Sequence, residues 1–193
     1  NRLINKTLIM KRILFALAVV CTIQQMFSQE LPISEKTNKI SYEGVINIEE
    51  ASATDLYVKA NEWFAITFNS ANNVIQMQDK EAGKLIGKGV IQARLKQYGS
   101  LKYSGLWNYT LSINTREGRY KYSLTNINHS GRDGIQYTMP DCGLIENEKS
   151  DCPLYYSKKK WNQEKERLNT EIKIIVNNLL EFMSDINNED DDW

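Results

Sequence analysis

The one histidine of the chain, His129, is the natural place to look for catalytic chemistry. It lies at the end of a predicted strand, with Ser130 beside it and Asp133 and Asp141 nearby in the sequence. A hydroxyl, an imidazole and a carboxylate are the nucleophile, base and orienting acid that a hydrolase needs. The segment has no nucleophile-elbow pattern, however, and a lone histidine at a strand end is more often a surface or capping residue. We therefore predict a protein without catalytic residues and keep a hydrolase that uses His129 as an alternative.

Two cysteines, Cys142 and Cys152, are the second chemical feature, and both lie in turn-like segments that contain glycine or proline. The chain has no C-x-x-C pattern, and it does not offer the closely spaced ligand set that zinc requires. In an oxidising compartment such a pair forms a disulfide. The bond would close a loop of 11 residues and stabilise the fold by about 2.7 kcal/mol on the chain-entropy model. We predict this disulfide and neither metal nor cofactor; free or metal-binding thiols are the alternative.

A row of hydrogen-bonding side chains is the third candidate. Residues 107–114 alternate between apolar and polar side chains, 115–118 form a turn, and 119–128 resume the alternation until Ile127, which indicates a bulge near Asn126. This pattern predicts an antiparallel hairpin with one buried face and one wetted face. The polar face could hydrogen-bond a sugar, a peptide or a partner strand, although an ordinary wetted sheet has the same pattern. Its members are Asn108, Thr110, Ser112, Asn114, Arg119, Lys121, Ser123 and Thr125.

The elements that position these residues follow from periodicity and turn signals. Residues 53–68 have helical spacing, and Ser52 with Asp55 has the pattern of a capping box. Gly87 and Gly89 interrupt one strand and indicate a bulge or close backbone packing. Residues 130–156 are predicted to be an irregular connection. The predicted strands besides the hairpin are 40–48, 74–78 and 84–95. A helix over 161–186 is predicted from the spacing of Leu168, Ile172, Ile175, Leu179, Phe182 and Ile186.

The N-terminal segment has the pattern of an export signal. We expect translation to start at Met10, with residues 1–9 upstream of the start. Two basic residues then precede an uncharged apolar run over 13–23, which is shorter than the roughly 20 residues that span a bilayer as a helix. We therefore predict that residues 1–28 comprise upstream residues and a signal peptide, with cleavage after Ser28. A polar leader over 29–39 follows.

Two other readings of the N-terminal segment remain alternatives. A membrane anchor that is not removed is one, although no positive stop signal follows the apolar run. A lipoprotein modified at Cys21 is the other, and the bulky Val20 disfavours it. After cleavage the chain keeps 20 basic and 24 acidic residues, a net charge of −4, because residues 1–28 hold four basic and no acidic residues. This balance argues against a nucleic-acid partner, which needs a concentrated positive surface.

The order of these pieces resembles a bacterial domain of unknown function that is described as having a TATA-binding-protein-like (TBP-like) fold. The resemblance covers residues 40–130. It implies an antiparallel sheet with helices on one side, and it implies no activity. The residues that carry it are 40–48, 53–57, 63–65, 74–76, 86–89, 118–122, Ile127 and His129.

We therefore predict an α+β protein: an antiparallel sheet of about five strands with helices packed on one face and a long C-terminal helix. Residues 40–187 form the single domain, and 188–193 form an acidic tail. The expected function is that of an exported protein of the periplasm or the extracellular space, with no stable membrane span. We expect it to be a non-catalytic module that binds a protein or a small ligand of the cell envelope. A small-molecule carrier with a cavity between sheet and helix is an alternative, beside the hydrolase.

Overall fold

The computed structural model describes residues 31–68, 74–132 and 138–185. The chain divides into two units, Asn1–Leu31 and Pro32–Trp193, and all elements below belong to the second unit. The predicted signal peptide, the first residues of the polar leader and the acidic tail lie outside the described residues. Within the part of the chain that is described, no helix is both long enough and apolar enough to cross a membrane.

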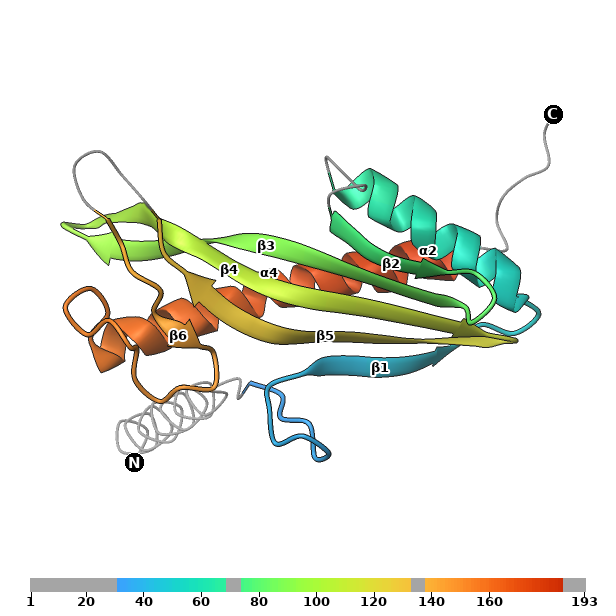
Figure 1. The fold of residues 1–193 in the computed structure, drawn as a ribbon, viewed down its shortest axis with the longest axis horizontal. Coiled ribbons are helices and arrows are strands. Elements are labelled where there is room, and N and C mark those ends of the chain that lie inside the picture. The colour runs from blue at the N-terminus through green and yellow to red at the C-terminus, as the bar shows by residue number, and fades with distance from the viewer. Residues whose placement is uncertain (1–30, 69–73, 133–137, 186–193) are drawn as a thin grey trace, which may run out of the picture. The chain divides into compact units, whose positions relative to one another are not determined.

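A six-stranded antiparallel sheet forms the centre of the second unit (Figure 1). The strand order is β1-β5-β4-β3-β2, and the short β6 pairs with β5 beyond the end of β1. The predicted α+β class and antiparallel sheet are therefore confirmed. The strands are β1 (Tyr42–Asn47), β2 (Ile75–Asp79), β3 (Lys84–Gln97), β4 (Ser100–Arg116), β5 (Arg119–Ser130) and β6 (Gly143–Leu144).

Strands β3 and β4 are longer than the sequence predicted. The prediction ended the third strand at residue 95 and began the hairpin at residue 107, whereas the strands continue to Gln97 and start again at Ser100. Tyr98 and Gly99 connect them with φ angles of 49° and 80°. Positive φ at both central residues suits the twist of a two-residue hairpin turn. Tyrosine is an uncommon residue in this conformation, so the sequence carries only a weak signal for the turn.

Two helices, α2 (Ala53–Thr67) and α4 (Lys158–Ser184), are described. The predicted cap of α2 is confirmed, because Ser52 Oγ accepts a hydrogen bond from the Asp55 N–H at 3.1 Å. Helix α4 begins three residues earlier than predicted, because Ser157 is its N-cap residue. Capping side chains satisfy N–H groups that have no partner inside a helix.

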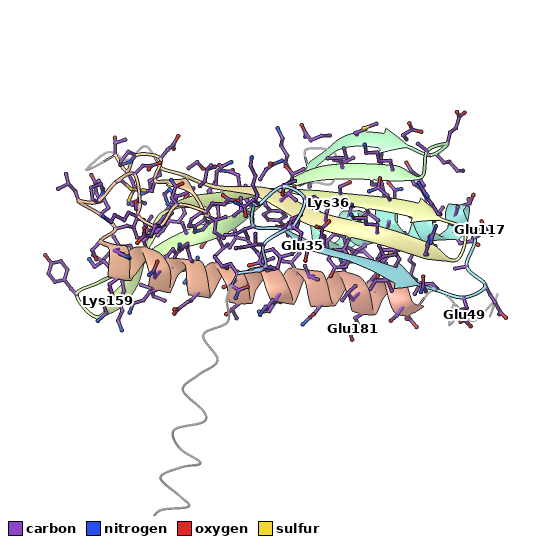
Figure 2. All side chains as sticks on the ribbon, turned by 90° about the horizontal axis from the view of Figure 1, so that it is seen from below. Glu35, Lys36, Glu49, Glu117, Lys159 and Glu181 are labelled. Atoms are coloured by element: carbon purple, nitrogen blue, oxygen red, sulfur yellow. A yellow bond between two sulfur atoms is a disulfide. The ribbon has the colours of Figure 1, made fainter. Side chains whose placement is uncertain are left out.

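Both helices pack on the same face of the sheet, and Figure 2 shows α4 along that face. The ring of Phe64 in α2 lies over Gly87 of β3, and Trp161 of α4 stacks near Trp107 of β4 with ring centroids 5.1 Å apart. The Trp63 indole N–H donates to Asn178 Oδ1 at 2.8 Å and joins the two helices. The largest fully buried side chains of this core are Trp63, Trp107, Trp161, Tyr120, Tyr156 and Phe64.

The apolar stripe of α4 differs in part from the prediction. Leu168, Ile172 and Leu179 are buried as expected, whereas Ile175 and Phe182 are only half-buried. Val176 and Met183 occupy the buried positions instead. The stripe follows the 3.6-residue turn of the helix. Ile175 and Val176 are both apolar, as are Phe182 and Met183, so the sequence pattern does not show which member of each pair is buried. The predicted Ile186 lies outside the described residues.

Both irregularities that the sequence indicated in the sheet are present. Gly89 pairs with Tyr109, whose phenol ring lies across the space that a Cβ at Gly89 would fill, so this glycine permits close packing. In the hairpin, the register of β4 and β5 shifts between Asn108 and Thr110, and Asn126 has a φ of 54°. The predicted bulge near Asn126 is therefore confirmed.

A buried carboxylate fastens α4 to the sheet. Glu164 Oε1 accepts hydrogen bonds from the Arg94 N–H at 2.9 Å and from the Trp107 indole N–H at 3.1 Å. The Arg167 guanidinium donates to both Glu164 oxygens at 2.7 and 3.0 Å and also to the Gln92 carbonyl at 2.6 Å. Arg94 lies beside a second register shift, between Ala93 and Arg94. No local pattern in the sequence indicated this role for Glu164.

Candidate functional site

The eight predicted polar-face residues lie together on the sheet face that is turned away from the helices. The register pairs Thr110 with Thr125 and Ser112 with Ser123, and it places Asn114 opposite Lys121. Their apolar neighbours in the alternation, such as Leu111 and Leu124, are buried on the helix side. Arg119 is exposed and the other seven are half-buried. The alternation in the sequence therefore predicted the composition of one continuous surface, here called the open face.

The open face is wider than the predicted hairpin, because β1 and β3 flank it. Glu43, Val45 and Asn47 of β1 lie opposite Ser123, Lys121 and Arg119, respectively. On the other side, Lys84, Ile86 and Lys88 of β3 lie opposite Asn114, Ser112 and Thr110. Sequence reasoning missed these contributions, since the pattern within one strand does not state which strand lies beside it.

Part of the open face is held by its own hydrogen bonds. The Asn108 amide donates to Asn128 Oδ1 at 3.1 Å and to Ser130 Oγ at 2.9 Å. Asn114 donates to Ser112 Oγ at 3.2 Å. Asn108 is thus committed to contacts within the sheet. The amide of Asn114 is held in a fixed position toward the other end of the face, at the turn between β4 and β5.

At that end the open face contains a depression of about 370 Å³. Lys121 forms an ion pair with Glu43, with Nζ and Oε2 3.0 Å apart, and this contact holds the pKa of the Glu43 carboxyl below its usual value. Arg116 was not among the predicted residues, because the sequence placed its neighbourhood in the turn. The depression is lined by Val45, Asn114, Arg116, Arg119, Tyr120 and Lys121.

His129 occupies a different place from the one predicted. Only 2% of the residue is exposed, and the rings of Trp107, Tyr156 and Trp161 surround it with centroids 5.4, 5.7 and 6.4 Å away. The Cys142 N–H donates to His129 Nδ1 at 3.3 Å. Burial lowers the pKa of the imidazole to about 4, against the backbone of Ser104 and the charge of Asp141, which act to raise it. The expectation of a surface or capping histidine is wrong, because β6 pairs beside His129 and aromatic residues cover it.

The residues of the hydrolase alternative do not meet in the described structure. His129 pairs opposite Trp107, whose side chain is in the core, whereas Ser130 donates to the Leu106 carbonyl and accepts from Asn108. Asp141 accepts a hydrogen bond from the Gly131 N–H at 2.7 Å. Asp133 lies outside the described residues. Among the residues that are described, no group of three or more His, Cys, Asp and Glu side chains could hold a metal ion.

The predicted disulfide between Cys142 and Cys152 is present, with Cα atoms 5.0 Å apart. Both cysteines are buried, and the Asp151 N–H donates to the Cys142 carbonyl at 3.0 Å. The bond therefore closes the connection between β5 and α4 directly beside His129. The short strand β6 lies inside this connection, which is otherwise irregular as predicted.

Replacing both cysteines by alanine is expected to lower the free energy of unfolding by about 2.7 kcal/mol. The reason is that the unfolded chain regains the conformational entropy that the disulfide removes by closing the loop from Cys142 to Cys152. Urea denaturation followed by circular dichroism measures the change. Leu154→Ala is the matched control, since Leu154 is exposed and lies just beyond Cys152 in the connection between β5 and α4. An unchanged unfolding midpoint in the double variant would show that the bond contributes no stability.

Comparison with known proteins agrees with this architecture. Residues 42–130 match the family model described as "Domain of unknown function (DUF4468) with TBP-like fold". A crystal structure of a DUF4468 family protein from Bacteroides ovatus ATCC 8483 is 16% identical, with a TM-score of 0.54 over 79% of this chain and 91% of that one. A TBP-like protein from Parabacteroides distasonis ATCC 8503 is 12% identical, with a TM-score of 0.54 over 78% of this chain and 97% of that one.

No curated protein matches the chain. At these identities the two structures show the fold alone, and a shared fold does not specify an activity. The family model covers nearly the same residues as the resemblance in the sequence, which it confirms. Residues 42–130 of this chain match the DUF4468 family model, and the chain has the TBP-like fold of the two solved structures.

Proposed function

We propose that the protein is an exported, non-catalytic binding module whose open face contacts a protein or a small ligand of the cell envelope. The observation that supports this proposal is the one-sided packing of the sheet. Both described helices cover the face that carries Trp107 and Leu111. The opposite face presents polar side chains from the adjacent strands β1, β5, β4 and β3. A polar surface of this kind binds through hydrogen bonds and charge, with affinity set by a few well-placed groups.

Two observations favour this proposal over the alternatives. The space between sheet and helices is filled by fully buried Trp63, Trp107 and Trp161, and this dense packing disfavours a carrier with an internal cavity. The imidazole of His129 is enclosed by aromatic rings and accepts a backbone N–H, which disfavours a hydrolase that uses it. The N-terminal signal pattern and the buried disulfide both support export to an oxidising compartment.

Site-specific photo-crosslinking in intact cells tests the proposal. A photoreactive amino acid replaces Ser123, which lies in the middle of the open face on β5, the strand between β1 and β4. The control places it at Glu181, which is exposed on α4 and points away from the sheet (Figure 2). We expect a discrete adduct from Ser123 and none from Glu181, on protein whose first residue is Gln29 and which is recovered from the periplasm or the medium.

Three results would contradict the proposal. Identical adducts from Ser123 and Glu181 would show that the open face has no preference. Illumination that yields no adduct from Ser123 would show that the face is not occupied in the cell. Recovery of the adduct on uncleaved protein in the cytoplasm would overturn export and leave the binding face standing.

A further inference from the structure

The depression on the open face contains two guanidinium groups that form no ion pair with the acids of the described residues. Arg116 and Arg119 lie directly opposite each other in the register of β4 and β5. Like charges in this arrangement destabilise a sheet. The ion pairs within the described residues join Lys121 to Glu43, Lys158 to Glu148, and Arg167 to Glu164 and Glu171, so none of them involves Arg116 or Arg119.

Two acidic side chains near this pair, Glu117 and Glu43, have other partners. Glu117, in the turn between the two arginines, accepts a hydrogen bond from the Ala53 N–H at 3.1 Å at the start of α2. Figure 2 places Glu117 and Glu49 at the end of the sheet. Glu43 is paired with Lys121. In the described part of the chain, neither of these two carboxylates forms an ion pair with Arg116 or Arg119.

The lining of the depression matches the chemistry of an oxyanion. A guanidinium presents parallel N–H donors that bind a carboxylate or a phosphate through two hydrogen bonds. The Asn114 amide is held beside them by its contact with Ser112. Val45, which is 58% exposed, adds an apolar wall. The volume of about 370 Å³ lies within the range of small-molecule sites.

We propose that this depression binds the carboxylate or phosphate group of a small ligand, with Arg116 and Arg119 as its two principal contacts. The proposal rests on the proposed function, because the depression is part of the open face. It assigns a chemical class to the ligand and a location to its charged group. It also accounts for two like charges that lie opposite each other and form no ion pair with the acids of the described residues.

Titration followed by ¹H–¹⁵N NMR tests the proposal on the mature protein. Inorganic phosphate and citrate are the two probes, each added at constant ionic strength, with sodium chloride as the reference. We expect saturable shifts at Asn114, Arg116 and Arg119 with at least one probe, and the more tightly bound probe identifies the phosphate or the polycarboxylate class. The double variant R116Q/R119Q should bind at least tenfold more weakly.

A charge-matched control separates the site from the overall charge of the protein. K88Q/K159Q also removes two positive charges, one on the open face outside the depression and one on α4, and should keep the affinity. R116Q/R119Q should unfold at a urea concentration no lower than wild type, because it removes a like-charge contact, so weaker binding cannot be ascribed to unfolding.

Absence of saturable shifts with either probe, or equal binding by R116Q/R119Q and wild type, would overturn the oxyanion site. Shifts that sodium chloride reproduces would overturn it as well. A crosslinked adduct at Ser123 that persists in R116Q/R119Q cells would then show that the binding face stands while the ligand class is wrong. If the otherwise unchanged protein gives no adduct at Ser123, the proposed function itself is wrong.

Discussion

Replacing Glu164 by alanine is expected to lower the free energy of unfolding by about 3–5 kcal/mol. The carboxylate accepts the Arg94 N–H, the Trp107 indole N–H and two bonds from Arg167. Its removal leaves a largely buried guanidinium with only the exposed Glu171 as a counter-charge, and it leaves the Arg94 N–H and the Trp107 indole N–H without this acceptor. Urea denaturation measures the loss, with tryptophan fluorescence and circular dichroism as independent probes of the transition.

Variants around Glu164 distinguish the charge from the packing. Glu166→Ala is the matched control, since Glu166 is exposed on the same helix and has no part in this network. Glu164→Gln should also be destabilising, because it keeps the volume and removes the charge. The double variant Glu164→Gln with Arg167→Met should recover part of the loss, since no uncompensated charge remains. A cost for Glu164→Ala equal to that for Glu166→Ala would show that the buried contacts are not stabilising.

Acidification from pH 7 to pH 4 is expected to remove about 3 kcal/mol of stability through His129 alone. Its pKa is about 4 in the folded protein and about 6.5 in the unfolded chain. Above pH 6.5 both states are neutral and the stability is fully present. As the pH falls from 6.5 to 4, the imidazole binds a proton in the unfolded state and not in the folded state. The free energy of unfolding therefore decreases until the pH reaches the pKa of His129 in the folded protein.

The difference between wild type and His129→Phe isolates this contribution from the carboxylates, which titrate in both proteins. Between pH 7 and pH 4, the unfolding free energy of the variant should decrease by about 3 kcal/mol less than that of wild type. The pKa itself is measurable without any variant, since the chain has one histidine and therefore one imidazole signal in the NMR spectrum. A titration midpoint near 6.5 in the folded protein would refute the enclosed imidazole.

Local signals in the sequence were sufficient for most of the elements. The Ser52 cap, the alternation around the hairpin, the bulge near Asn126 and the close packing at Gly89 each depend on neighbours in the chain, and each is present. The resemblance to the family supplied the layer arrangement. The extension of β3 and β4 was missed, because it depends on a turn with an uncommon residue, Tyr98, at positive φ.

What the sequence could not show depends on contacts between distant segments. Arg94 and Glu164 are 70 residues apart in the chain, and no local pattern indicates that a carboxylate of the long helix reaches a strand. The enclosure of His129 depends likewise on β6 and α4. The polar row was predicted residue by residue, whereas the depression needed β1 beside β5 to bring Val45 next to Arg119 and Lys121.

The placement of the short strands limits how copies of this protein can join by backbone pairing. An unpaired strand border is a template for aggregation. The long β5 is lined on its outer side by β1 and then by β6, and the terminal strands β1 and β2 have only six and five residues. Beyond Gly87 of β3, which pairs with the first residue of β2, Glu164 and Arg167 bind the Arg94 N–H and the Gln92 carbonyl of β3. Side chains of α4 thus bind two backbone groups of β3 that a further strand would otherwise pair with, which makes this border a poorer starting point for an intermolecular sheet.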